Sequence, residues 1–352
     1  MAFQVRIRQW EEPVAVEPGQ TILEAALAQG VAYPHGCRSG NCGACKSHLH
    51  GGEIELAPYS EYALTEAERR SGLILACRAV PWSDADIAWL DTDELIVHPQ
   101  RRLKCRVAGL EQATHDIRIV RLEILSGGPF SFSAGQYAQV KFAGLPARDY
   151  SMANRPDQLV TDQPGLEFHI RQLGGGTASV YAAKQLKLGD PVSVDGPFGT
   201  SYLRALHTGP ILAIAGGSGL APIKSIVETA LAQGMAQPIR LYFGVRDERD
   251  LYGEPEMAAL EAAHPNFCFI PVLSAPVLSE GGDSTARRTG FVHHAVAADL
   301  DDIDGMKAYL AGPPPMVEAA AALLAERGMR REDIHADAFY TEAEKAALGA
   351  AG

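Results

Sequence analysis

The stretch CRSGNCGAC at residues 37–45, with Cys77 downstream, decides how the first part of this chain folds. Its cysteines follow the C-x4-C-x2-C…C spacing that is typical of a plant-type [2Fe-2S] cluster. Two bridged irons need four thiolates, so one tight loop supplies three and the fold brings back the fourth. A structural zinc site and a disulfide pair fit less well, because the spacing from Cys37 to Cys42 differs from that of paired C-x2-C zinc sites. We therefore expect Cys37, Cys42, Cys45 and Cys77 to be the metal ligands.

Length and composition indicate a globular protein of more than one domain. The chain has 352 residues, of which 47% are hydrophobic and 21% charged, enough for two or three separate cores. The longest apolar stretch, residues 211–223, is interrupted by glycines and Pro222 and is too short to span a bilayer. The first residues alternate like a strand and show no export signal. With four of the six cysteines assigned to a cluster, no disulfide framework remains. We expect a cytoplasmic protein with no membrane segment.

The charge of the chain is negative and unevenly distributed. The net charge is −12, and residues 1–100 carry 14 Asp and Glu against 7 Lys and Arg, a difference of −7. Nucleic acid is therefore excluded as an expected partner. Two interpretations of the acidic segment stay open: it steers the cluster-bearing domain onto a basic patch of a protein partner, or it serves solubility alone.

Hydrophobic patterning divides the chain into three parts. The first is a compact α+β unit, the second has short alternating strands with glycine and proline turns and one helix at residues 178–185, and the third alternates apolar strands with amphipathic helices. This predicts a multidomain α+β and α/β protein with a β-grasp ferredoxin, an antiparallel β-barrel and a doubly wound parallel sheet. The predicted bounds are 1–96 for the ferredoxin domain, 97–102 for a linker, 103–206 for the barrel and 207–352 for the nucleotide-binding domain.

The first unit can be predicted in more detail. We expect a strand at residues 3–8 and a short helix at 22–29 that ends at Gly30. A hairpin is predicted at 46–56 around Gly51 and Gly52, because the flanking residues alternate. A strand at 73–80 should carry Cys77.

Two motifs of the barrel segment indicate a flavin site. RDYS at residues 148–151 offers an arginine, an aromatic ring and a hydroxyl in close succession, and GGGTAS at 174–179 leads into the predicted helix. A glycine turn at a helix N-terminus presents free N–H groups to a phosphate, and Arg148 can add a bidentate contact. Tyr150 can pack on a flavin ring while Ser151 reaches its redox nitrogen.

A second glycine turn indicates a nicotinamide nucleotide site. The apolar strand at 211–215 runs into GGSGLAP at 216–222 and then into a helix. The turn differs from the G-x-G-x-x-G fingerprint, but it permits the same close backbone approach to a phosphate. GPPPM at 312–316 also follows a strand and precedes a helix, so both strand ends should face one crevice.

These motifs together resemble those of the ferredoxin–NAD(P)H reductase superfamily, and within it the reductase components of aromatic-ring-hydroxylating dioxygenases. The resemblance covers essentially the whole chain. The motifs that carry it are the four cysteines, RDYS, GPFG at 196–199, GGSGLAP, LYFGVR at 241–246, GPPPM, and DAFY at 337–340.

The resemblance implies roles for individual residues. Arg148 would contact the FAD pyrophosphate, Tyr150 would pack on the isoalloxazine, and Ser151 would bind near its N5, which makes Tyr150 and Ser151 the catalytic pair. Phe339 would cover the other flavin face until nicotinamide displaces it. The flavin phosphates are assigned to Gly175, Gly176 and Thr177, and those of the nicotinamide nucleotide to Gly217, Ser218 and Gly219. His169, Ile170, Arg246, Gly312, Pro313 and Met316 complete the expected cofactor-binding set, with His169 either structural or at the flavin edge.

Two departures from the family pattern bear on function. Many relatives have a cysteine before the Gly-Pro-Pro run, and here that position is Ala311, so a thiol role is absent. NADPH-using relatives place Ser-Arg after the strand that here ends at Ser274, but this chain has Ala275 next. This favours NADH over NADPH, although Arg246 and Arg249 lie near enough in the sequence to compensate.

Three functions remain open at this point. The first is the reductase of a Rieske-type aromatic dioxygenase, taking hydride from NADH to FAD and passing single electrons through the [2Fe-2S] cluster to a ferredoxin or to the oxygenase. The second is the reductase of a di-iron phenol or alkane monooxygenase or of another multicomponent system. The third is a redox carrier or sensor without catalysis. We expect a monomer that docks transiently, and no protein general acid or base.

Overall fold

The computed structural model describes residues 2–36, 38–40, 43–61, 63–90, 96–159, 165–275 and 287–344. Cys37 and Cys42, two of the predicted ligands, lie outside these ranges. The described residues of Met1–Val97 and Tyr340–Gly352 form one compact unit, and His98–Phe339 form a second. Within the described ranges, every helix is too short or too polar to span a bilayer.

The first unit is built on a mixed sheet with strand order β2-β1-β7-β3-β5. In that sheet β1 and β7 are parallel, and the other neighbouring strands are antiparallel. Helix α1 begins at a capping box of Thr21 and Glu24 and buries its apolar face on the unit's core. The elements are β1 (Phe3–Ile7), β2 (Val14–Val16), α1 (Ile22–Ala28), β3 (Lys46–Gly51), α2 (Glu66–Arg70), β5 (Leu73–Leu75) and β7 (Ala85–Trp89). The predicted compact α+β unit is confirmed.

Two local predictions for this unit are wrong. The predicted hairpin around Gly52 does not form, since β4 (Ile54–Leu56) pairs with β6 (Ala79–Pro81) in a separate two-stranded sheet. Gly52 has φ +97°, and a Cβ there would lie 2.5 Å from the Asp84 carbonyl oxygen, so the turn packs on the chain leading to β7. The predicted strand at 73–80 is divided into β5 and β6, with Cys77 in the turn between them.

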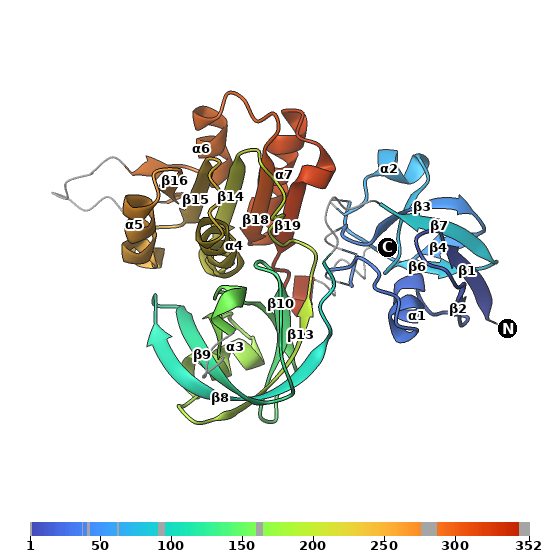
Figure 1. Ribbon diagram of the computed structural model, residues 1–352, viewed down its shortest axis with the longest axis horizontal. Helices are drawn as coiled ribbons and strands as arrows, with labels where there is room; N and C mark the ends of the chain where they lie inside the picture. The colour runs from blue at the N-terminus through green and yellow to red at the C-terminus, as the bar shows by residue number, and fades with distance from the viewer. Residues whose placement is uncertain are drawn as a thin grey trace. The chain divides into compact units, whose positions relative to one another are not determined.

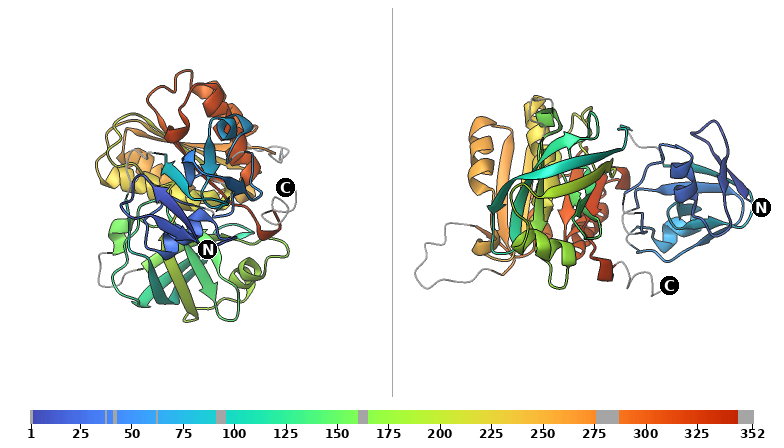
Figure 2. Two further views of the ribbon diagram at one scale, coloured as in Figure 1. Left: turned by 90° about the vertical axis from the view of Figure 1, so that its right-hand side faces the viewer. Right: turned by 90° about the horizontal axis from the view of Figure 1, so that it is seen from below.

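The first part of the second unit is an antiparallel sheet that closes almost into a barrel. Its strand order is β11-β10-β13-β8-β9-β12, and a bridge between Met152 and Phe168 joins the end of β11 to β12. Figure 2 shows β8 and β9, in teal, as long strands of this barrel. The elements are β8 (Arg101–Gln112), β9 (Ile117–Ser126), β10 (Tyr137–Phe142), β11 (Arg148–Ser151), β12 (Gly165–Arg171), α3 (Thr177–Lys184) and β13 (Pro191–Phe198). The predicted barrel is confirmed.

The second part of this unit is a parallel sheet with order β17-β16-β15-β14-β18-β19. Helices α4 and α5 lie on one face and α6 and α7 on the other, as Figure 1 shows. The elements are β14 (Ile211–Gly216), α4 (Leu220–Ala232), β15 (Ile239–Val245), α5 (Glu254–Ala263), β16 (Phe267–Leu273), β17 (Arg288–Thr289), α6 (Val292–Asp299), β18 (Lys307–Gly312), α7 (Pro314–Glu326) and β19 (Ile334–Ala338). The doubly wound sheet is confirmed, and α6, β17 and β19 are elements that the patterning did not predict.

Candidate functional site

Two of the predicted cysteine ligands, Cys45 and Cys77, lie next to each other in the first unit. Cys45 directly precedes β3, and Cys77 occupies the turn between β5 and β6. Both are buried, and the backbone N–H of Cys77 donates to Sγ of Cys45 at 3.5 Å. The N–H of Ala76 also donates to the Cys45 carbonyl oxygen at 3.1 Å, which holds the two chain segments in register. An N–H aimed at a sulfur is the contact that stabilises a cluster thiolate.

The loop that carries the other cysteines packs closely on its surroundings. Gly40 and Gly43 have φ of 80° and 73°, a region that favours glycine. A Cβ at Gly40 would lie 2.9 Å from Cβ of Tyr59 and equally close to Cγ of Arg78. The burial of Cys45 and Cys77 and the N–H contact between them fit a [2Fe-2S] cluster.

In the barrel, β11 presents the three residues of the predicted flavin motif. Tyr150 is partly buried against the barrel core, and burial raises its pKa to about 12, so its hydroxyl stays protonated at neutral pH. Ser151 is buried and donates from Oγ to Oδ2 of Asp337 at 3.3 Å. Nη1 of Arg148 donates to the Ala147 carbonyl oxygen at 2.8 Å.

The turn before α3 has the form of a phosphate site. Gly175 has φ +79°, and Gly176 is the N-cap of α3 without a side chain that caps the helix. The first N–H groups of the helix therefore lack a side-chain partner. A Cβ at Gly175 would meet nothing within 4 Å, and Thr177 is exposed beside it. Backbone donors, a hydroxyl and open space fit the flavin phosphates.

The nucleotide turn follows β14 and touches the end of β18. Gly217 has φ +53°, and Gly219 leads into α4 without a side-chain cap. A Cβ at Gly219 would collide with the Ala311 carbonyl oxygen, and one at Gly312 would lie 2.8 Å from the Gly216 carbonyl oxygen. The two strand ends thus approach to backbone contact, which only glycine permits. This cradle fits the diphosphate of a nicotinamide nucleotide.

The predicted flavin and nucleotide residues come together at one edge of the sheet. The N–H of Phe339 donates to the Gly312 carbonyl oxygen at 2.9 Å, and Asp337 on β19 holds Ser151 of the barrel. Met316 lies against the same turn, since its Sδ would be 2.5 Å from a Cβ at Gly216. Of the other predicted residues, Ser218 lies in the turn, Ile170 is buried in the barrel core and Pro313 is exposed.

Arg246, a predicted cofactor-binding residue, forms its ion pairs with carboxylates of this chain. Its guanidinium pairs with Asp250 at 3.2 Å and lies 3.8 Å from Asp116. Arg249 pairs with Asp247 at 3.1 Å. Both arginines therefore already have carboxylate partners.

A buried polar network beside the nucleotide turn joins one predicted site residue, His169, to residues that the sequence did not single out, namely Glu167, Lys224 and Tyr252. His169 is buried, its Nδ1 lies 2.9 Å from the Tyr252 hydroxyl, and its Nε2 lies 3.3 Å from Oε1 of Glu167. Glu167 also accepts from Nζ of Lys224 at 3.1 Å. One sequence signal for this network exists, a lysine on the otherwise apolar face of α4.

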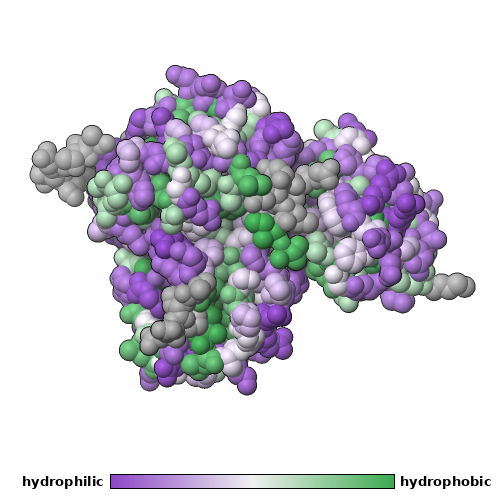
Figure 3. All heavy atoms as spheres, viewed as in Figure 1, coloured by the Kyte–Doolittle hydropathy of each residue, from purple (hydrophilic) through white to green (hydrophobic). Residues whose placement is uncertain are grey.

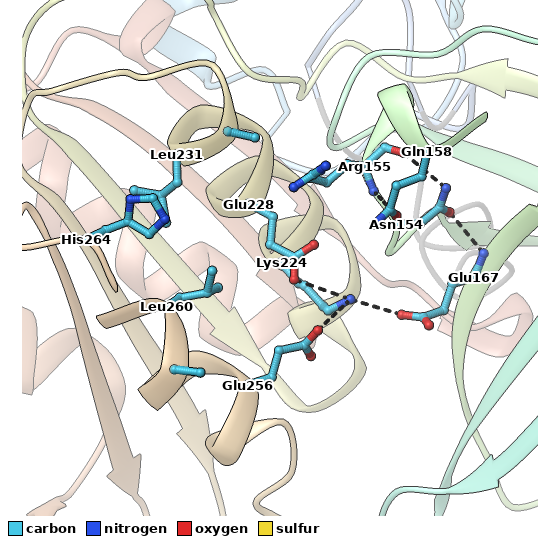
Figure 4. A pocket seen from close by; sticks show the side chains of 12 residues that line it. Asn154, Arg155, Gln158, Glu167, Lys224, Glu228, Leu231, Glu256, Leu260 and His264 are labelled. Atoms are coloured by element: carbon cyan, nitrogen blue, oxygen red, sulfur yellow. Dashed lines mark hydrogen bonds and ion pairs between the residues drawn. The ribbon is translucent and has the colours of Figure 1, made fainter. Parts of the chain in front are cut away.

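Lys224 lies at the base of a groove of about 470 Å³ between the barrel and helices α4 and α5. Figure 4 shows its ammonium between Glu167, Glu228 and Glu256, and the last two lie 3.5 and 3.4 Å from it. Burial raises the pKa of Glu228 to about 7, and repulsion from Glu256 and Glu167 adds to this against the attraction of Lys224. One ammonium facing three carboxylates favours a proton on Glu228.

Comparison with known proteins assigns a different cofactor-binding family to each of the three parts of the chain. The family description "2Fe-2S iron-sulfur cluster binding domain" matches residues 5–81, "Oxidoreductase FAD-binding domain" matches 104–217, and "Oxidoreductase NAD-binding domain" matches 213–322. The ferredoxin–NAD(P)(+) reductase component of the naphthalene 1,2-dioxygenase/salicylate 5-hydroxylase systems of Ralstonia sp. is 41% identical, over 92% of this chain and 94% of its own length.

Relatives from other oxygenase systems are also similar. The reductase component of phenol 2-monooxygenase from Pseudomonas sp. is 37% identical, over 98% of this chain and 97% of its own length. Among solved structures, the Amycolatopsis cytochrome P450 reductase GcoB has a TM-score of 0.76 and 36% identity, over 96% of this chain and 98% of its own.

The raised pKa of Glu228 predicts a pH-dependent effect of Glu228→Gln. A carboxyl whose pKa rises from its ordinary value of 4.5 to about 7 on folding stabilises the fold fully below pH 4.5 and loses this contribution as the pH passes 7. Glutamine stays neutral, so the variant should match the parent near pH 5 and exceed its unfolding free energy by about 1–3 kcal/mol near pH 8.5. Thermal unfolding across this pH range measures the difference.

Glu326→Gln, at an exposed position at the end of α7, is the matched control and should show no such trend. A Glu228→Gln difference that stays constant from pH 5 to 8.5 would contradict the protonated carboxyl.

Proposed function

The chain belongs to the ferredoxin–NAD(P)(+) reductase superfamily, and from this we propose that it delivers electrons from NADH to a ferredoxin or a Rieske-type oxygenase in aromatic-ring dihydroxylation. The observation that carries the proposal is the edge at which β11, β14, β18 and β19 meet, because it brings a flavin motif and a nucleotide cradle together in one unit. The chain is an oxidoreductase with 2Fe-2S, FAD and NAD domains.

In this proposal each domain holds one redox group. Residues 1–96 form the ferredoxin domain, 97–102 a linker, 103–206 the FAD domain and 207–352 the NAD domain. When bound, the flavin accepts a hydride from NADH and supplies electrons singly to the cluster. Cys37, Cys42, Cys45 and Cys77 would hold the irons.

The barrel residues then have binding and orienting roles. Arg148 and the turn at Gly175, Gly176 and Thr177 hold the FAD phosphates, while Tyr150 packs on the ring. The Ser151 hydroxyl donates its hydrogen bond to Asp337, so the Ser151 oxygen can act as an acceptor for an N–H group of the flavin ring. Phe339 covers the ring in the absence of nicotinamide.

The acceptor is proposed from relatives and from charge. The Ralstonia relative is named as a reductase component of a dioxygenase system, and residues 1–100 of this chain carry a net charge of −7, from 14 acidic and 7 basic residues. The face seen in Figure 3 is rich in hydrophilic side chains over this first unit. An acidic surface favours fast, salt-sensitive docking on a basic partner. A cytoplasmic monomer suits such a transient encounter.

A second function is supported by one observation. The phenol 2-monooxygenase reductase component matches 98% of this chain at 37% identity, which makes a di-iron monooxygenase for phenols or alkanes the alternative acceptor. The two candidates share all three domains and differ only in the protein that receives the electron. A non-catalytic carrier is disfavoured, since both cofactor cradles are intact.

We propose that the chain prefers NADH to NADPH. Ala275 is exposed after β16, where an arginine would bind the 2′-phosphate of NADPH, and its N–H donates to the Arg246 carbonyl oxygen at 2.8 Å. Arg246 and Arg249 are paired with Asp250 and Asp247. Their charge is therefore already compensated.

The proposed function is tested by measuring electron transfer to protein acceptors in the parent protein and in the Cys77→Ser variant. The parent protein, reduced with NADH under anaerobic conditions, should reduce a purified Rieske ferredoxin or oxygenase. Cys77→Ser removes one cluster ligand but leaves the flavin barrel unchanged. The variant should reduce a two-electron dye with NADH at a rate within about twofold of the parent rate. Its rate of electron transfer to the protein acceptor should fall at least about 100-fold.

Cys268→Ser, on β16 and outside the ligand set, should keep both rates. If the parent reduces a di-iron monooxygenase but no Rieske protein, the second function replaces the first. Loss of both activities in a folded Cys77→Ser protein would contradict separable centres.

Ala275→Arg tests the nucleotide preference. In the parent, kcat/KM should be higher for NADH than for NADPH, because Arg246 and Arg249 are already paired with carboxylates. The new guanidinium should raise kcat/KM for NADPH by about tenfold, the effect of roughly 1.4 kcal/mol from one charge-assisted contact. Steady-state kinetics with both nucleotides measure this, and a parent that prefers NADPH would refute the assignment.

A further inference from the structure

A chain of hydrogen bonds links the nucleotide turn to the flavin barrel through buried side chains. The Tyr252 hydroxyl lies 3.2 Å from the Gly217 carbonyl oxygen and 2.9 Å from Nδ1 of His169. Nε2 of His169 lies 3.3 Å from Oε1 of Glu167. Gly217 belongs to the turn after β14, whereas His169 and Glu167 lie on β12 of the barrel, so Tyr252 connects two layers of the second unit.

Glu167 sets the proton arrangement of this chain. Its carboxylate accepts from Nε of Arg121 at 2.8 Å and from Nζ of Lys224 at 3.1 Å. Although burial opposes it, the hydrogen bond from His169 and these two positive charges keep the pKa of Glu167 well below its usual range. An ionised carboxylate only accepts, so Nε2 of His169 must carry a proton.

His169 therefore presents an acceptor to Tyr252. Burial, the largest cause, lowers the pKa of His169 against the opposing effect of Glu167, which favours a neutral ring with its single proton on Nε2. Nδ1 is then unprotonated and can only accept. The single proton of the Tyr252 hydroxyl therefore lies between two acceptors, the Gly217 carbonyl oxygen at 3.2 Å and Nδ1 at 2.9 Å, as in a three-centre hydrogen bond.

Packing keeps the Tyr252 ring in place. The ring is buried, and it makes edge contacts with His169 and Phe243 at centroid distances of 5.4 and 5.7 Å. On the other side of the turn, a Cβ at Gly217 would lie 3.3 Å from Nη1 of Arg171, which is paired with Asp116 at 2.8 Å. The turn is thus flanked on two sides by side chains that β12 orders.

We infer that Tyr252 and His169 are positioning residues for hydride transfer, which set the nucleotide turn at Gly217 relative to the flavin barrel. This inference rests on the proposed use of the turn by NADH. The network contacts the turn through the Gly217 carbonyl oxygen and not through an N–H group, so it acts on the distance between hydride donor and acceptor. A displacement of about 1 Å can cost up to 100-fold in rate without abolishing binding.

Tyr252→Phe tests this by removing only the hydroxyl. In anaerobic stopped-flow, the rate of flavin reduction at saturating NADH should fall about tenfold. The dissociation constant of NAD⁺ from the oxidised holoenzyme, measured by calorimetry, should change less than about threefold. Tyr242→Phe is the matched control, because Tyr242 is also buried on the sheet but its hydroxyl bonds to Asp299 at 3.2 Å.

Two His169 variants separate positioning from packing. The His169→Asn side chain can still accept from Tyr252, so this variant should keep most of the rate. The His169→Gln side chain keeps only the contact with Glu167, so this variant should behave like Tyr252→Phe. Nitrogen-15 NMR of histidine-labelled protein should show His169 as the Nε2–H tautomer, with its Nδ1 shift moved in Tyr252→Phe and unmoved in Tyr242→Phe.

The inference is overturned if Tyr252→Phe reduces its flavin at the parent rate, if Tyr242→Phe loses as much rate, or if His169 carries its proton on Nδ1. Failure of the proposed function would show differently, as a parent protein whose flavin NADH does not reduce.

Discussion

Backbone contact between the ends of β14 and β18 is the constraint on which the rest of the second unit depends. A side chain at Gly219 would strike the end of β18, and one at Gly312 would strike the end of β14, so glycine is required on both sides. Helix α4, which follows β14, begins at Gly219 without a capping side chain, so the turn before it is the end of this edge that suits a diphosphate. Helix α7, which follows β18, begins with Pro314 and Pro315, which have no N–H to offer.

The same edge is held to the barrel by polar contacts as well as by apolar packing. Ser151 reaches Asp337 on β19, and His169 reaches Tyr252 beside the nucleotide turn. Burying Glu167 and Lys224 is costly unless each is paired, and here the two charges compensate each other across the boundary between barrel and sheet. Such pairs are weak sources of stability but define one relative position, which suits a reaction that depends on distance.

Much of the fold could be predicted from the sequence, because periodicity and glycine turns are local signals. The helix predicted at 22–29 and the strand predicted at 211–215 each differ from the observed element by one residue at the C-terminal end. The prediction of a hairpin at 46–56 was wrong, because local alternation cannot show that β4 pairs with β6 and not with β3. The short edge strand β19 was missed because its residues alternate weakly, although it carries Asp337. Tyr252 was missed because its partner is 83 residues away along the chain.

The central claim is that this one chain holds both a flavin and a [2Fe-2S] cluster and that electrons from NADH reduce both of them. Anaerobic titration of the purified holoprotein with NADH, followed by visible and electron paramagnetic resonance spectroscopy, tests this most directly. Two electrons on the flavin and one on the cluster predict an uptake of about three electrons per chain, with the cluster signal appearing after flavin absorbance falls. An uptake of about two electrons with no cluster signal, or a cluster that stays oxidised beside a reduced flavin, would contradict the account.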